Sequence, residues 1–78
     1  MSEEKLKKVF AESLGVDPAL VVDGLEFNAI PEWDSVAHMT LVAAIDRTFD
    51  VTLETEDVIN MSSFAAAKEI LKKYAIQF

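Results

Sequence analysis

Apolar residues recur every three or four positions in several stretches of the chain, a spacing that predicts amphipathic helices. The expected helices, three long and one short, cover residues 3–14, 35–49, 54–60 and a last stretch from Ser62 or Ser63 to about Tyr74. The inner faces of the three longer helices are predicted to present Leu6, Val9, Phe10, Leu14, Val36, Met39, Val42, Ala43, Ile45, Phe49, Phe64, Ala67, Ile70, Leu71 and Tyr74. No strand pattern or internal repeat is found, so residues 1–78 are predicted to form one all-α domain, a small bundle of three longer helices and one short helix.

The segment between the first two predicted helices, residues 15–34, lacks helical periodicity but is rich in apolar groups. Gly15, Asp17-Pro18, Asp23-Gly24 and Pro31 interrupt any regular pattern. Its apolar side chains are Val16, Leu20, Val21, Val22, Leu25, Phe27, Ile30 and Trp33. Connections this long between helices are usually functional or disordered. The apolar content predicts an ordered loop that packs onto the bundle.

The tripeptide Asp34-Ser35-Val36 places a hydroxyl where this loop gives way to the second predicted helix. Ser35 is the expected N-cap, although His38 stands where a full capping box has Glu or Gln. A helix N-terminus exposes unpaired N–H groups and the positive end of the macrodipole. The position therefore suits a serine that bears an anionic phosphate ester, but a serine that merely caps a helix is also common.

Charge is unevenly distributed along the chain, which has a formal net charge of −7. Six of the seven basic residues lie near the termini, so Arg47 is the one cation between residues 9 and 67, where eleven acidic residues lie. Such a surface repels nucleic acid and anionic lipid and attracts partners with basic patches. An acidic surface that serves solubility alone is the simpler alternative.

Composition narrows the chemistry further. The chain has no cysteine and one histidine, so neither a disulfide framework nor a zinc site is expected, and no metal ligand set is predicted. The crowded carboxylates of residues 46–57 match no calcium-loop spacing. The charged start and the lack of a long apolar run predict a cytoplasmic protein without a membrane anchor, and the lack of sustained heptads predicts a monomer.

The chain resembles the acyl carrier protein family over residues 3–75. The resemblance rests on Trp33-Asp34-Ser35-Val36, on Phe49-Asp50-Val51 and on the acidic stretch Glu54-Thr55-Glu56-Asp57. In that family a phosphopantetheinyl transferase esterifies the motif serine with 4′-phosphopantetheine from coenzyme A. The resemblance implies that Ser35 is this attachment point, with Val36 in place of the more usual leucine. The thiol of the arm would hold acyl cargo as a thioester, so the chain itself would be a carrier and not an enzyme.

The resemblance also implies a cavity for the acyl chain and a surface for partner enzymes. The residues expected to line the cavity are Met39, Val42, Ala43, Ile59 and Ala66. The residues expected to contact the transferase and the acyl-loading, condensing or acyl-transfer enzymes are Asp34, Val36, Met39, Asp46, Asp50, Glu54 and Asp57. Carriers of primary fatty acid synthesis resemble one another in an acidic face here, whereas Ala37, His38 and Thr40 are neutral. The hypothesis is therefore a stand-alone carrier that serves enzymes of fatty acid, polyketide or specialised lipid pathways, with a specialised pathway favoured.

Three alternatives stay open at this point. An amino-acyl carrier of the D-alanyl or peptidyl kind is the nearest, although the approach through Ile30-Pro31-Glu32 lacks the glycine-rich pattern typical of peptidyl carriers. An unmodified acidic helical adaptor would keep the same fold without using Ser35. A hydrolase built from Asp34, Ser35 and His38 is the least favoured, because the sequence indicates no oxyanion site and His38 is expected to be exposed.

Overall fold

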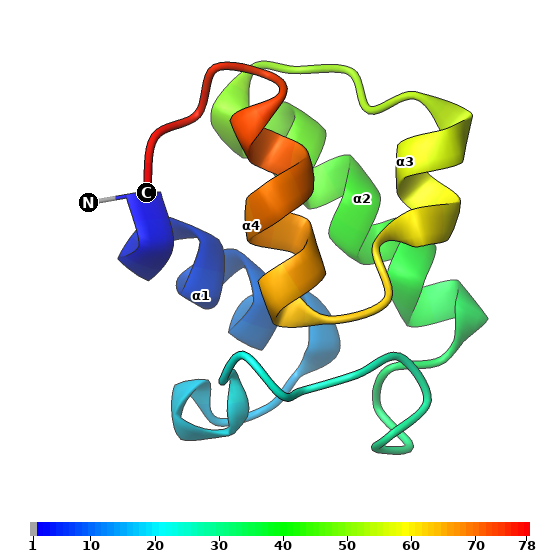
Figure 1. The fold of residues 1–78 in the computed structure, drawn as a ribbon. Helices are drawn as coiled ribbons and strands as arrows, with labels where there is room; N and C mark the ends of the chain where they lie inside the picture. The colour runs from blue at the N-terminus through cyan, green and yellow to red at the C-terminus, as the bar shows by residue number, and fades with distance from the viewer. Residues whose placement is uncertain (1) are drawn as a thin grey trace.

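The predicted all-α architecture is confirmed. The computed structural model describes residues 2–78, and its elements follow in the order α1 (Ser2–Leu14), the 3₁₀ turn η1 (Pro18–Leu20), α2 (Ser35–Phe49), α3 (Thr55–Asn60) and α4 (Phe64–Lys72) (Figure 1). The three longer helices and the short α3 lie within a residue or two of their predicted bounds. The end of α2 is set by Asp50, which adopts the left-handed conformation at φ 55°, a conformation common just after a helix.

The core is built around an aromatic cluster contributed by three different segments. The ring of Phe10 in α1 meets Trp33 of the loop edge-on, with 5.4 Å between centroids, and meets Phe64 of α4 at 5.1 Å. All three side chains are almost completely buried. Edge-to-face contacts between aromatic rings stabilise a fold by more than the burial of apolar surface alone provides. The loop is thus joined to the two helices on which it packs.

The loop of residues 15–34 is ordered and packs on the bundle, as its apolar content predicts. Val21, Leu25 and Trp33 are buried, whereas Leu20 and Val22 are exposed. Backbone hydrogen bonds tie the loop to the segment before α4: the amide of Phe27 donates to the Ser62 carbonyl at 2.9 Å, and the amide of Phe64 donates to the Leu25 carbonyl at 3.0 Å. Around these bonds, Glu26 and Ser63 form an isolated antiparallel bridge. The approach to Ser35 is therefore fixed by backbone pairing as well as by burial.

The buried face of α2 differs from the predicted one. Leu41, Val42 and Ile45 are buried, whereas Val36 and Met39 are 77% and 58% exposed and Ala43 is also exposed. The error arises because α2 is apolar around most of its first three turns, so periodicity alone does not select a face. The packing of α1 and the loop selects the face of Leu41, which leaves Val36 and Met39 on the surface near Ser35.

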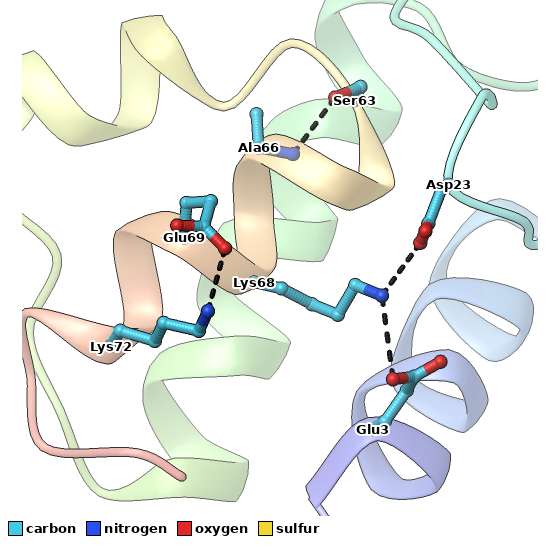
Figure 2. Close-up of polar contacts among 7 residues, drawn as sticks. All are labelled: Glu3, Asp23, Ser63, Ala66, Lys68, Glu69 and Lys72. Atoms are coloured by element: carbon cyan, nitrogen blue, oxygen red, sulfur yellow. Dashed lines mark hydrogen bonds and ion pairs between the residues drawn. The ribbon is translucent and has the colours of Figure 1, made fainter. Parts of the chain in front are cut away.

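Lys68 in α4 connects three segments of the fold (Figure 2). Its ammonium group lies 2.6 Å from a carboxylate oxygen of Asp23 in the loop and 3.4 Å from one of Glu3 in α1. The hydrogen bond with Asp23 is the main cause of the raised pKa of Lys68. In the same view, Ser63 caps α4 by accepting from the Ala66 amide at 2.9 Å. One terminal lysine thus offsets acidic charge from both the loop and α1.

Among residues 2–78, no helix has the length and apolar character needed to cross a bilayer. Within the same residues, His, Asp and Glu side chains do not gather in groups of three or more that could hold a metal ion. The crowded acidic residues of the sequence are separated by the fold.

Candidate functional site

Asp34, and not Ser35, is the N-cap of α2. A carboxylate oxygen of Asp34 accepts a hydrogen bond from the Ala37 amide at 2.8 Å, and its carbonyl accepts the first helical bond, from the His38 amide at 2.9 Å. The prediction that Ser35 is the cap is wrong, because the carboxylate of the preceding residue takes that role. Ser35 is the first residue of the helix, and it is exposed. Its hydroxyl is not needed to complete the helix.

A groove of about 340 Å³ opens beside Ser35. Its lining is mostly apolar and comes from the loop, from α2, from α3 and from the segment after α3; it consists of Phe27, Ser35, His38, Met39, Val58, Ile59, Met61 and Ser62. Of the residues predicted to line a cavity, Met39 and Ile59 lie here. Val42 is instead in the core, Ala43 lines a separate hollow between α1 and α2, and Ala66 in α4 lies away from the groove. The serine hydroxyl and an apolar groove therefore lie together.

His38 is a structural member of this site, and the expectation that it is exposed is wrong. The indole N–H of Trp33 donates to Nδ1 of His38 at 3.0 Å, and Nε2 of His38 lies 2.8 Å from the carbonyl oxygen of Val58 in α3. An indole N–H can only donate and a carbonyl can only accept, so Nδ1 is the acceptor and Nε2 bears the proton. The imidazole thus bridges the loop and α3 through both of its ring nitrogens.

This arrangement bears on the hydrolase alternative. A serine nucleophile needs a ring nitrogen of a nearby histidine as its base. Both nitrogens of His38 already have partners, Trp33 and Val58. The structure does not bring Asp34, Ser35 and His38 into a catalytic triad, because Asp34 caps the helix and His38 bonds to α3.

Curated relatives match the chain along nearly its whole length. An acyl carrier protein of Buchnera aphidicola subsp. Baizongia pistaciae is 31% identical over 78 residues, which covers 92% of each chain. Acyl carrier proteins of Rhodopseudomonas palustris strains BisB18 and HaA2 are each 34% identical over 77 residues, covering 96% of this chain and 98% of theirs. The chain belongs to the acyl carrier protein family. No family model matches it.

In this member of the acyl carrier protein family, the residues predicted to contact partners lie in three different settings. Asp34, Val36 and Met39 are exposed close to Ser35. Asp50 and Glu54 are also exposed, but Asp50 lies at the opposite end of α2, which is about 22 Å long. Asp46 lies near that same end of α2, where it is half-buried and accepts a hydrogen bond from the Leu53 amide at 3.1 Å.

Asp57 lies in the third setting, which does not fit a partner contact. Its side chain is buried, and its carboxylate accepts hydrogen bonds from the Lys73 ammonium and from the Tyr74 hydroxyl, each at 2.6 Å. These two bonds, with Lys73 first, hold the pKa of Asp57 below its usual value, while the same contacts raise the pKa of Lys73 and of Tyr74. The Tyr74 hydroxyl also accepts from the Glu54 amide at 3.0 Å. Asp57 therefore fastens α3 to the end of α4.

Replacing Asp57 by asparagine is expected to lower the stability of the fold, because the neutral amide loses both charge-assisted bonds. The ionised carboxylate contributes stability that is fully present above its unfolded-state pKa of about 3.9 and is lost as the pH falls through its lower folded-state pKa. The difference between the two proteins should thus be constant near neutral pH and shrink below about pH 4. Urea titrations at several pH values measure it.

Glu56→Gln is the matched control, because Glu56 is the exposed carboxylate one residue earlier in α3. Its effect should stay within about 0.5 kcal/mol, the range usual for surface substitutions. Equal losses in the two variants, or a difference between Asp57→Asn and the parent that does not shrink as the pH falls below about 4, would contradict the role given to Asp57.

Several residues of the site were not foreseen from the sequence. Phe27, Val58, Met61 and Ser62 line the groove although they come from separate segments. The hydrogen bond between Trp33 and His38 could have been suspected from the sequence. A tryptophan buried in an apolar loop needs an acceptor for its indole N–H, and the one histidine of the chain follows five residues later.

Proposed function

We propose that this chain carries acyl groups as thioesters on a 4′-phosphopantetheine arm attached to the Oγ atom of Ser35, and that it presents them to biosynthetic enzymes. The observation that supports this proposal most is that, at the start of α2, one residue caps the helix and the next residue has an exposed hydroxyl. Asp34 completes the helix, which leaves the exposed Ser35 hydroxyl for chemistry at the mouth of an apolar groove. On this proposal the chain is a carrier and catalyses no reaction itself.

The residues around Ser35 fit a phosphodiester. The first-turn N–H groups of α2 and the positive end of its dipole favour an anion at this position. In the attachment step, the Ser35 hydroxyl gives up its proton and Oγ forms the ester bond to phosphorus, while the bond to the departing adenosine 3′,5′-bisphosphate breaks. The donor is coenzyme A, and the enzyme is a phosphopantetheinyl transferase. Once attached, the arm supplies a thiol that this cysteine-free chain lacks.

The lining of the groove supports an acyl rather than an amino-acyl cargo. Phe27, Met39 and Ile59 offer apolar surface, and the lining includes no carboxylate that could pair with an ammonium group. Burying an unpaired ammonium is costly, whereas burying methylene groups is favourable. We therefore place D-alanyl and peptidyl carriage second.

The surface near Ser35 supports a partner that combines apolar contacts with a basic patch. Val36 and Ile59 are 77% and 73% exposed, and Asp34 supplies negative charge beside them. Ala37, His38 and Thr40 add no charge to the start of α2. This surface suits binding by condensing or acyl-transfer enzymes of a polyketide or specialised lipid pathway better than binding by enzymes that recognise a strongly acidic helix. We infer that the carrier acts in the cytoplasm as a monomer.

Intact mass measurement tests the proposal. The purified chain is incubated with coenzyme A and a broad-specificity phosphopantetheinyl transferase, and its mass is expected to rise by one phosphopantetheine. Fragmentation should locate the added group on the peptide that contains Ser35. A chain that starts unmodified and gains no mass would favour the acidic adaptor, and a group located on another serine would overturn the site assignment.

A further inference from the structure

Helix α3 forms one wall of the groove but has little apolar attachment of its own. It is six residues long, and its one buried side chain is the carboxylate of Asp57. Val58 is half-buried and Ile59 is exposed. Helices this short are not stable by themselves. Apart from the partly buried Val58, which packs against the core, and the buried residues Leu53 and Met61 that flank the helix, α3 is held by polar contacts, those of Asp57 on one side and that of the Val58 carbonyl with His38 on the other.

The contact with His38 links α3 directly to the buried aromatic cluster of the core. Trp33 is fully buried, and its ring packs edge-on against Phe10 at 5.4 Å and Phe27 at 6.1 Å. Its indole N–H therefore points in a fixed direction, and His38 is oriented by accepting from it. The other ring nitrogen then donates across the groove to Val58. The imidazole thus forms one of the links between α3 and the core.

We propose that His38 is a positioning residue that latches α3 to the core through its bonds with Trp33 and Val58, and that a second proton on the imidazole releases this latch. In the neutral ring, Nδ1 accepts from the indole and Nε2 donates to the carbonyl. Protonation turns Nδ1 into a donor that faces another donor, and the buried Trp33 N–H loses its acceptor. The ring must then turn away, and α3 loses its hydrogen bond to His38.

The groups around the imidazole make this response specific to His38. The loop presents the uncharged rings of Trp33 and Phe27, and α3 presents a carbonyl. The carboxylate next to that carbonyl, Asp57, is directed toward Lys73 and Tyr74. On α2 itself, Asp34 is exposed and one of its oxygens is bonded to the Ala37 amide.

The second attachment of α3 does not change over the same pH range. The pKa of Asp57 is held below its ordinary value by Lys73 and Tyr74, so the carboxylate stays ionised from about pH 8 to about pH 5, the range in which histidines titrate. Release of the latch thus frees the His38 side of α3 while the Asp57 side stays fastened. The consequence for cargo rests on the proposed function: α3 would swing outward and widen the groove beside the attached arm.

Amide hydrogen exchange of the unmodified chain, followed by NMR, tests the latch without requiring any loading at Ser35. The readout is the protection of the Val58, Ile59 and Asn60 amides, normalised to the exchange of an unstructured peptide at each pH. Between about pH 8 and about pH 5, protection of these amides is expected to fall roughly two- to tenfold, the effect of losing one hydrogen bond. Amides of Leu41 and Ile45 in the core of α2 should keep their protection.

Two variants separate the latch from general destabilisation. His38→Gln offers an amide oxygen for the indole and an N–H for Val58 but does not titrate, so α3 should stay protected at both pH values. Trp33→Phe removes the donor that orients the ring and should lower the protection of α3 already at about pH 8. The inference is overturned by α3 protection in the parent chain that is independent of pH, by an equal fall in His38→Gln, or by an equal fall in α2. Because the chain is unmodified throughout, failure of the carrier proposal would leave these outcomes unchanged.

Discussion

Replacing Ser35 by alanine is expected to abolish the mass gain with coenzyme A and transferase while leaving the helices intact. The hydroxyl is the proposed attachment atom, so no product can form without it. The fold should tolerate the change because Asp34 supplies the cap and Ser35 is exposed at the first helical position. Alanine is also the best helix former, so stability should change by no more than about 0.5 kcal/mol. Intact mass and a thermal melt followed by circular dichroism measure the two effects.

Ser62→Ala is the matched control for this experiment. Ser62 is another exposed serine in the lining of the same groove, but it lies in the segment between α3 and α4. This variant should gain one phosphopantetheine as the parent chain does. Modification that persists in Ser35→Ala, or that is lost in Ser62→Ala with the helices preserved, would count against Ser35 as the attachment point.

The largest loss of stability is expected from Trp33→Ala. Truncation of a fully buried tryptophan typically costs about 3–5 kcal/mol, and here it also leaves Nδ1 of His38 without its donor. A domain of this length has a total stability of roughly 4–12 kcal/mol. The variant should therefore be partly unfolded at room temperature, or should unfold at a much lower urea concentration than the parent chain. Circular dichroism during a urea titration measures the shift.

Val22→Ala provides the comparison, since Val22 lies in the same loop but is exposed. Its unfolding midpoint should be close to that of the parent chain. If Trp33→Ala also unfolds at the parent midpoint, the loop does not contribute to the core in the way that the aromatic contacts indicate.

The helices were predictable because their signals are local. The apolar spacing of residues 3–14 and the polar residues that precede Ser35 and Phe64 contain the information needed to start or stop a helix. The packed loop was also predictable, since apolar side chains in an irregular segment have to be buried. Even so, the choice between Asp34 and Ser35 as the cap could not be made, because both residue types are preferred there.

The roles of His38 and Asp57 could not be predicted because their partners are distant in the sequence. His38 bonds to a carbonyl twenty residues later, and Asp57 bonds to Lys73 sixteen residues later. When only the residues adjacent in sequence are considered, a histidine on a helix and an acidic residue in an acidic stretch are both predicted to have solvent-exposed side chains. The face of α2 is a related case, since α1 packs against α2 and the buried side of α2 depends on such packing rather than on α2 alone.

The antiparallel bridge between Glu26 and Ser63 also bears on how the chain acquires its shape. Hydrogen bonds between segments so far apart form only after a large part of the chain has been closed into a loop, and contacts of this kind slow folding. While the chain is being synthesised, the segment around Phe27 has no backbone partner until residues 62–64 have emerged. The ordered presentation of Ser35 thus depends on residues 62–64, so a chain that ends before them would lack the paired approach to this serine.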